Sequence, residues 1–179
     1  MEIEVFDYIT NDVLRKNIVS DFEHVIYLQT ISSTTDKNKK IRSHFYKDMV
    51  VHLGSIIEAI LFFEVSKIES TISQTEEWKY KNEKELYKIS DEQIIIGCEK
   101  FLKKTNFKLQ KSTTFKALND ICKDNGVITQ ELYEKCEKIR DMRNKIHITG
   151  LDKVEKIFKL EDVEESSSVI FELIQHLNP

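Results

Sequence analysis

Residues 49–63 read MVVHLGSIIEAILFF and form the most apolar stretch of the 179-residue chain. The stretch includes His52 and Glu58, and it is shorter than the roughly 20 apolar residues that a transmembrane helix needs. Apolar residues at helical spacing extend over about 39–69, and the second half of that segment is apolar on nearly all sides. We therefore expect a buried helix at the centre of a soluble helical bundle.

Glycine and proline are rare in the chain, with 4 Gly and 1 Pro, and the proline is the last residue. Because β-sandwiches need many turns, and turns need these residues, the composition argues against an all-β fold and favours long helices. The hydrophobic share of 40% supplies a core and excludes a disordered chain. The length corresponds to one domain, 1–179.

Helical periodicity and capping residues predict about five helices in all, that is, an all-α bundle. Besides the central helix we expect helices over 10–31 with Thr10 or Asn11 as cap, from Thr114 to near Asp124-Asn125-Gly126, from Thr129 to about His147, and over 161–177. Residues 32–40 are polar and predict a loop. Residues 70–111 lack a sustained helical period. They indicate either a short β-hairpin or an irregular insertion, with a strand over 92–97 as one alternative.

Charge and motifs exclude several classes of function. The net charge of −4 gives no support to binding of duplex DNA through a broad basic surface. The three cysteines, Cys98, Cys122 and Cys136, lack metal-ligand spacing and leave one thiol over in any disulfide scheme, which favours a reduced, cytoplasmic protein. The N-terminus has no signal-peptide pattern. No HExxH, CxxC or Gly-rich phosphate loop occurs, so we expect no metal site, no cofactor and no membrane partner.

The helix expected over 129–147 carries the residues best suited to chemistry. At about 100° per residue, Arg143 falls inside the apolar stripe of this helix, and Arg140 and His147 fall together on its edge. The planar donor fork of arginine suits phosphate, and histidine exchanges a proton near neutral pH. These two residue types suffice for RNA cleavage without a metal. Histidine takes the 2′-hydroxyl proton or protonates the leaving 5′-oxygen, and arginine stabilises the transition state.

A structural alternative accounts for the same residues. An arginine on an apolar stripe usually pairs with a carboxylate, and Glu58 in the central helix is the obvious partner. A histidine in the last turn of a helix usually stabilises the helix dipole. If Arg143 and Glu58 form a buried structural ion pair, loss of one partner costs roughly 3–5 kcal/mol.

The run 137–147, EKIRDMRNKIH, resembles the signature of the HEPN superfamily (higher eukaryotes and prokaryotes nucleotide-binding domain). That signature is an arginine followed by four to six residues and a histidine, often with an asparagine after the arginine. Arg140 has six residues before His147, whereas the pair Arg143-Asn144 has only three. The segment 55–61, SIIEAIL, resembles the central helix of the family, which often carries a glutamate, here Glu58, facing the motif helix.

The resemblance implies a helical homodimer whose two Arg/His helices face each other, with metal-independent endoribonuclease activity in prokaryotic defence or toxin–antitoxin systems. RNA and a cognate antitoxin or defence protein are the implied partners. The implied catalytic residues are His147, Arg143, Arg140 and Asn144, with Glu58 in support. The alternative is a non-catalytic HEPN-like module that binds protein or RNA, or only dimerises. The acidic net charge and the short Arg143 spacing favour this alternative.

Lysines cluster in an acid-free window at 100–116, interleaved with phenylalanines. The cluster predicts an RNA-backbone track with stacking aromatic rings. Its alternative is the solvated face of a helix with core aromatics, because charge runs usually only solvate a surface. The candidate RNA-binding residues are Lys100, Lys103, Lys104, Lys108 and Lys111.

Overall fold

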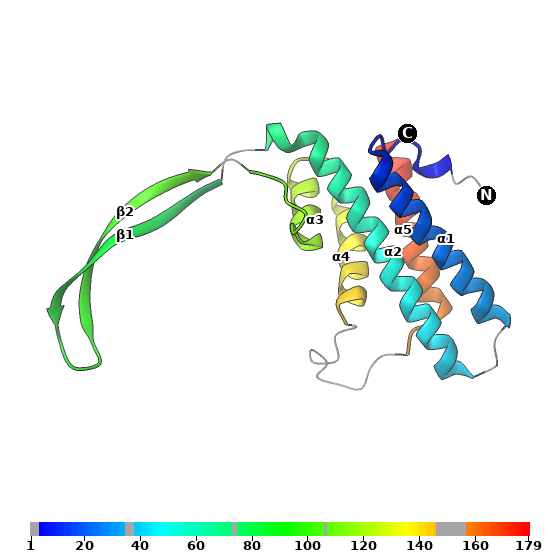
Figure 1. The fold of residues 1–179 in the computed structure, drawn as a ribbon, viewed down its shortest axis with the longest axis horizontal. Helices are drawn as coiled ribbons and strands as arrows, with labels where there is room; N and C mark the ends of the chain where they lie inside the picture. Colours follow the sequence, from blue (N-terminus) through cyan, green and yellow to red (C-terminus); the bar gives the residue numbers. More distant parts are fainter. Residues whose placement is uncertain (1–3, 35–37, 73–74, 106, 146–156) are drawn as a thin grey trace. The chain divides into compact units, whose positions relative to one another are not determined.

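The computed structural model describes residues 4–34, 38–72, 75–105, 107–145 and 157–179 (Figure 1). The chain divides into two compact units, one made of Met1–Lys67 with Lys111–Pro179 and the other of Ile68–Gln110. A short 3-10 turn, Glu4–Phe6, opens the first unit. Its five α-helices within the described ranges confirm the expected number: α1 Asp12–Thr34, α2 Lys39–Ile68, α3 Phe115–Asp124, α4 Gln130–Asn144 and α5 Leu160–Leu177.

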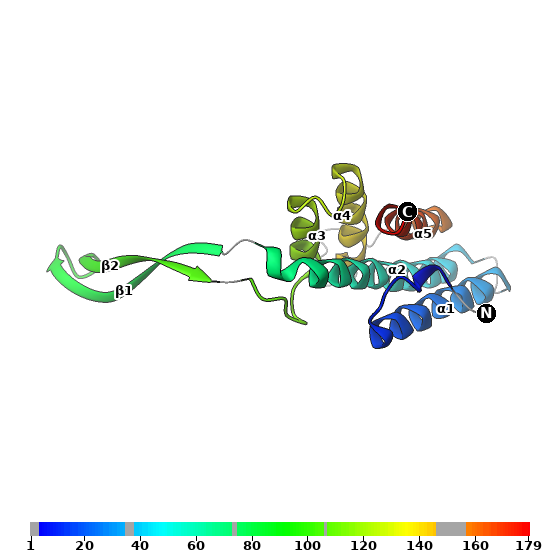
Figure 2. The ribbon, with the colours of Figure 1, turned by 90° about the horizontal axis from the view of Figure 1, so that it is seen from above.

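The helix α2 forms the centre of the helical unit. Figure 2 shows α2 between α1 on one side and α3, α4 and α5 on the other. Most of its apolar side chains from Met49 onward are buried, which confirms the central helix, whereas Ser55, Glu58, Ala59 and Phe62 are half-buried along one face. The buried residues include Met49, Leu53, Ile56, Ile57, Ile60 and Leu61. Among the described residues, one helical stretch, Lys39–Thr71, is long and apolar enough to cross a membrane by length and composition. It consists of α2 and the 3-10 turn Glu69–Thr71 that follows it, and 61% of its most apolar window is buried in the structure.

Three of the helices begin with side-chain caps at residues that the sequence predicted. The side-chain oxygens of Asn11, Thr114 and Thr129 accept hydrogen bonds from the backbone N–H groups three residues later, at 3.0, 3.3 and 3.2 Å. Each bond satisfies one of the N–H groups that a helix start leaves unpaired. After α3, Gly126 has a φ of +69°, which only glycine adopts without strain, and this conformation turns the chain toward α4.

The second unit is a two-stranded antiparallel sheet of β1, Thr75–Lys88, and β2, Ile94–Thr105. Thr75 pairs with Thr105, and the register shifts between Lys81 and Lys84 and between Glu85 and Tyr87. The sequence predicted only a short hairpin or an irregular segment, so the length of the strands corrects that expectation. The interpretation of the lysine window as a helix face is also wrong over β2. The chain is thus mostly helical with one hairpin.

Candidate functional site

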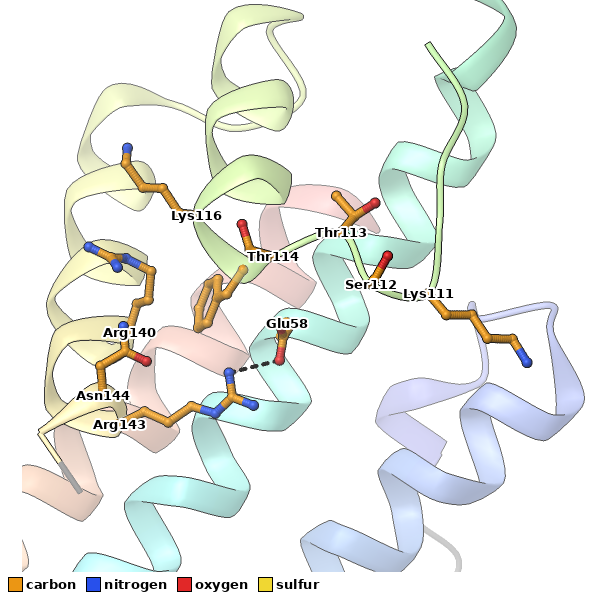
Figure 3. Close-up of a pocket in the computed structure, with 10 residues that line it drawn as sticks. Glu58, Lys111, Ser112, Thr113, Thr114, Lys116, Arg140, Arg143 and Asn144 are labelled. Carbon is orange, nitrogen blue, oxygen red and sulfur yellow. Dashed lines mark ion pairs between the residues drawn. The ribbon is translucent and has the colours of Figure 1, made fainter. Parts of the chain in front are cut away.

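A pocket of about 520 Å³ opens between α2, α4 and the start of α3 (Figure 3). Four cationic side chains and one carboxylate line it, although the whole chain carries a net charge of −4. Three consecutive hydroxyl residues and the N-terminus of α3 complete the wall, and a helix N-terminus favours anions. The lining residues are Glu58, Lys111, Ser112, Thr113, Thr114, Phe115, Lys116, Arg140, Arg143 and Asn144.

Arg143 lies in the last turn of α4 and reaches across to α2. Its Nη1 atom lies 2.8 Å from Oε2 of Glu58, and Figure 3 shows the two side chains directed toward each other. The side chains are 29% and 26% exposed, so the ion pair is half-buried. The pairing predicted from the sequence is therefore confirmed. Because a guanidinium carries five N–H donors, the bond to Glu58 still leaves capacity for an anion in the pocket.

Gly54 on α2 accommodates the close approach of the Arg143 side chain, a role that sequence reasoning missed. A Cβ atom at Gly54 would lie 3.1 Å from Cδ of Arg143 and 3.5 Å from its Cβ. The arginine stem therefore crosses α2 where α2 has no side chain. A glycine inside a helix lowers stability by roughly 0.5–1 kcal/mol relative to alanine. Its presence in the apolar central helix is therefore a sequence signal that another group approaches the helix backbone closely.

Arg140, the other candidate motif arginine, is held by carboxylates of its own helix. Its Nη2 atom lies 3.0 Å from Oε2 of Glu137 and 2.8 Å from Oδ1 of Asp141. Its Nε–H also donates to Oε2 of Glu137 at 3.2 Å. The geometry thus separates the two arginines. Arg143 contacts another helix beside the pocket, whereas the ion pairs of Arg140 are local to α4.

Lys116, in the first turn of α3, is a fixed cation at the same pocket. Its ammonium donates to Oδ1 of Asp120 at 2.5 Å and to the hydroxyl of Tyr133 at 2.6 Å, and that hydroxyl donates to Asp120 at 2.9 Å. Hydrogen bonds to Asp120 and Tyr133 hold the pKa of Lys116 above its ordinary value. Burial alone would raise the pKa of Asp120, but the hydrogen bonds from Lys116 and Tyr133 lower it. Lys116 therefore stays charged near neutral pH.

The other predicted site residues are distributed as follows. Asn144 is exposed and lines the pocket. Lys111 also lines it, but Figure 3 shows its ammonium directed away from the two arginines. Lys100 lies in β2 and Lys108 follows it, both in the hairpin unit. His147 lies outside the described residues, as do the side chains of Lys103 and Lys104.

The arrangement can bind a phosphate-sized anion through the Arg143 guanidinium and the wall of α3. The sequence predicted Thr114 only as the start of a helix, so the position of Ser112–Thr114 in the pocket wall is new. Within the described ranges, no group of three or more His, Cys, Asp or Glu side chains is placed to hold a metal ion.

Comparison of the chain with protein-family models, with curated proteins and with solved structures finds no match. The functional argument therefore depends on the residues and on the geometry of the pocket.

Proposed function

We propose that the chain is a HEPN-like, metal-independent endoribonuclease whose substrate phosphate binds in the pocket beside Arg143. The observation that carries the proposal is the half-buried Arg143–Glu58 pair in a pocket whose charged lining residues are four cations and one carboxylate, in an acidic chain. The pair orients a guanidinium that Glu58 only partly uses. An oriented, partly desolvated guanidinium is the group that stabilises developing charge on a phosphate.

The proposed reaction is an internal transfer at phosphorus. His147 removes the proton of the 2′-hydroxyl, and the 2′-oxygen bonds to the adjacent phosphorus while the bond to the 5′-oxygen breaks. The leaving 5′-oxygen takes up a proton, so the products are a 2′,3′-cyclic phosphate and a 5′-hydroxyl. Arg143 stabilises the charge on the phosphoryl oxygens, and Asn144 at the pocket edge orients the substrate. As the resemblance implies, we place this site in a homodimer.

The ion pairs of Arg140 support a second candidate function. Glu137 and Asp141 both contact its guanidinium, so an incoming phosphate has to compete with two carboxylates. If Arg140 is the residue that catalysis needs, this pairing favours a HEPN-like module that binds RNA or protein without cleaving it.

The experiment is an RNA cleavage assay in excess EDTA with Arg143→Met, whose apolar side chain keeps most of the arginine stem. We expect the variant to lose at least about 100-fold in rate, because a lost transition-state donor costs that much. Its free energy of unfolding should fall by only about 1–2 kcal/mol, since the pair is intermediate between exposed and buried ion pairs. Mass spectrometry of the products should detect the cyclic phosphate.

Arg15→Met is a matched control, because Arg15 is 33% exposed and forms an ion pair with Asp12 at 2.9 Å on α1. His147→Ala should abolish cleavage, whereas His44→Ala, at an exposed position of α2, should not. Cleavage by Arg143→Met at the parent rate would remove the pocket from the mechanism. RNA binding without cleavage by the parent chain would favour the non-catalytic module.

A further inference from the structure

The hairpin unit exposes an aromatic face that the proposed active site does not use. Trp78 pairs with Leu102 and Tyr80 with Lys100 across the two strands. Directly opposite residues of antiparallel strands share a face, so Trp78, Tyr80 and Lys100 lie together. The two rings are 55% and 58% exposed. The Lys100 ammonium lies 4.7 Å from the ring centre of Trp78 and 5.9 Å from that of Tyr80.

We propose that this face, the Trp78–Tyr80–Lys100 platform, binds unpaired bases of single-stranded RNA. The identity of the ligand as RNA rests on the proposed function, whereas the platform itself is a separate site on the other unit of the chain. Exposed rings that alternate with cations are the recurring means of binding single strands, because every base offers a face for stacking.

Lys100 decides between RNA and an apolar partner. Among the described residues no carboxylate pairs with Lys100, and neighbouring Glu99 lies on the opposite face, 3.5 Å from Lys81. An apolar partner that covered the rings would also bury this ammonium, which no described carboxylate compensates, and that burial is costly. A nucleic acid strand supplies a phosphate for the ammonium and a base for each ring.

Stacking and the present cation–π contacts compete for the same rings. A base stacked on an aromatic ring is worth more than an exposed cation–π contact, so the base displaces the ammonium from the ring face. The lysine side chain is long and flexible, and its three donors can then reach the phosphate of the same nucleotide.

Trp78 is the single tryptophan of the chain, so its fluorescence reports directly on the platform. The full chain is titrated with a 12-nucleotide oligouridylate in EDTA at low salt, with the His147→Ala variant used to prevent cleavage. We expect saturable quenching. Tyr80→Ala should raise the dissociation constant at least about fivefold. Lys100→Gln should also raise the dissociation constant, and it should reduce the slope of log Kd against log salt by about one.

Tyr87→Ala is the matched control, because Tyr87 is 66% exposed but pairs with Ile95, on the opposite face, and should bind as the parent does. Duplex RNA should not quench, since its bases are paired. Loss of cleavage in Arg143→Met with quenching unchanged would support the platform and show that the two sites are distinct. Absence of saturable quenching by single strands would overturn the proposal. If the tryptophan fluorescence is quenched by raising the protein concentration and not by RNA, the proposal is also overturned, and a second copy of the chain is the partner of the platform.

Discussion

At the scale of single residues, the position of the Arg143 side chain depends on Gly54. Gly54 leaves α2 without a side chain where the arginine stem crosses it, and Glu58, one turn further along α2, accepts from the guanidinium. The orientation of Arg143 is therefore set by a missing side chain as well as by an ion pair. An added methyl at Gly54 would act on this orientation without removing any charge.

We predict that Gly54→Ala separates activity from stability. Alanine in a helix interior gains up to about 1 kcal/mol over glycine, whereas a Cβ atom 3.1 Å from Cδ of Arg143 forces that side chain to shift. The free energy of unfolding in urea should stay within about 1 kcal/mol of the parent. RNA cleavage should fall about tenfold or more, because small displacements of a positioning group are costly.

Ser55→Ala provides the control for this substitution. The Ser55 hydroxyl donates to the Val51 carbonyl within the same helix, and Ser55 lines a different pocket. Parent-level cleavage by Gly54→Ala would mean that the tight contact between α2 and Arg143 does not position the guanidinium for catalysis.

Sequence reasoning could predict the Glu58–Arg143 pair because helical spacing placed Arg143 inside the apolar stripe of its helix, and Glu58 is a carboxylate within the apolar stretch of the central helix. It could not predict which of the two arginines reaches Glu58 on α2 and which is held on its own helix, since both line the pocket. That distinction depends on Glu137 and Asp141, which satisfy Arg140 on α4 itself. It also could not place Ser112–Thr114 in a pocket wall, because the spatial relation of three helices decides their surroundings.

At the scale of elements, the helix caps are the most local and most predictable devices of the fold. Thr114 and Thr129 have the same extended backbone region and the same type of bond to the third following N–H. They differ in one respect, since only Thr114 lines the pocket.

We predict that Thr114→Ala and Thr129→Ala each lower the free energy of unfolding by about 1 kcal/mol, the usual cost of a lost N-cap. Only Thr114→Ala should also weaken RNA binding, because its hydroxyl and the start of α3 form the pocket wall. Chemical denaturation and RNA titration of both variants provide the measurement. Equal loss of RNA affinity in the two variants would show that general destabilisation explains the effect.

The hairpin shows where element prediction failed. Its strands carry charged and apolar residues on both faces, and large apolar side chains such as Trp78, Leu86 and Ile95 are 46–63% exposed. The two register shifts interrupt the alternation of β1 further. A strand with one buried face shows a clear period of two. This hairpin buries neither face within its own unit, so the pattern that predicts strand length is absent.

At the scale of the whole molecule, the cysteines distinguish the two units. Cys98 is exposed on the hairpin, and Cys122 and Cys136 are buried on α3 and α4. Burial raises the pKa of both buried thiols to about 12. Because the thiolate is the reactive form, both groups stay protonated and unreactive at pH 8.

We predict that a thiol-specific reagent modifies one equivalent rapidly at pH 8, at Cys98, and two further equivalents only as the helical unit opens. Cys98→Ser should remove the rapid phase alone, and denaturant should make all three thiols react together. Because hydrogen bonds and an ion pair join α3 and α4 to each other and to α2, the two slow thiols should share one rate, set by cooperative opening of the bundle. Raising the pH from 7 to 9 should leave the buried pair slow, since both values lie well below 12. Rapid modification of Cys122 or Cys136 in the native chain would contradict the packing of α3 and α4, and with it the wall of the proposed site.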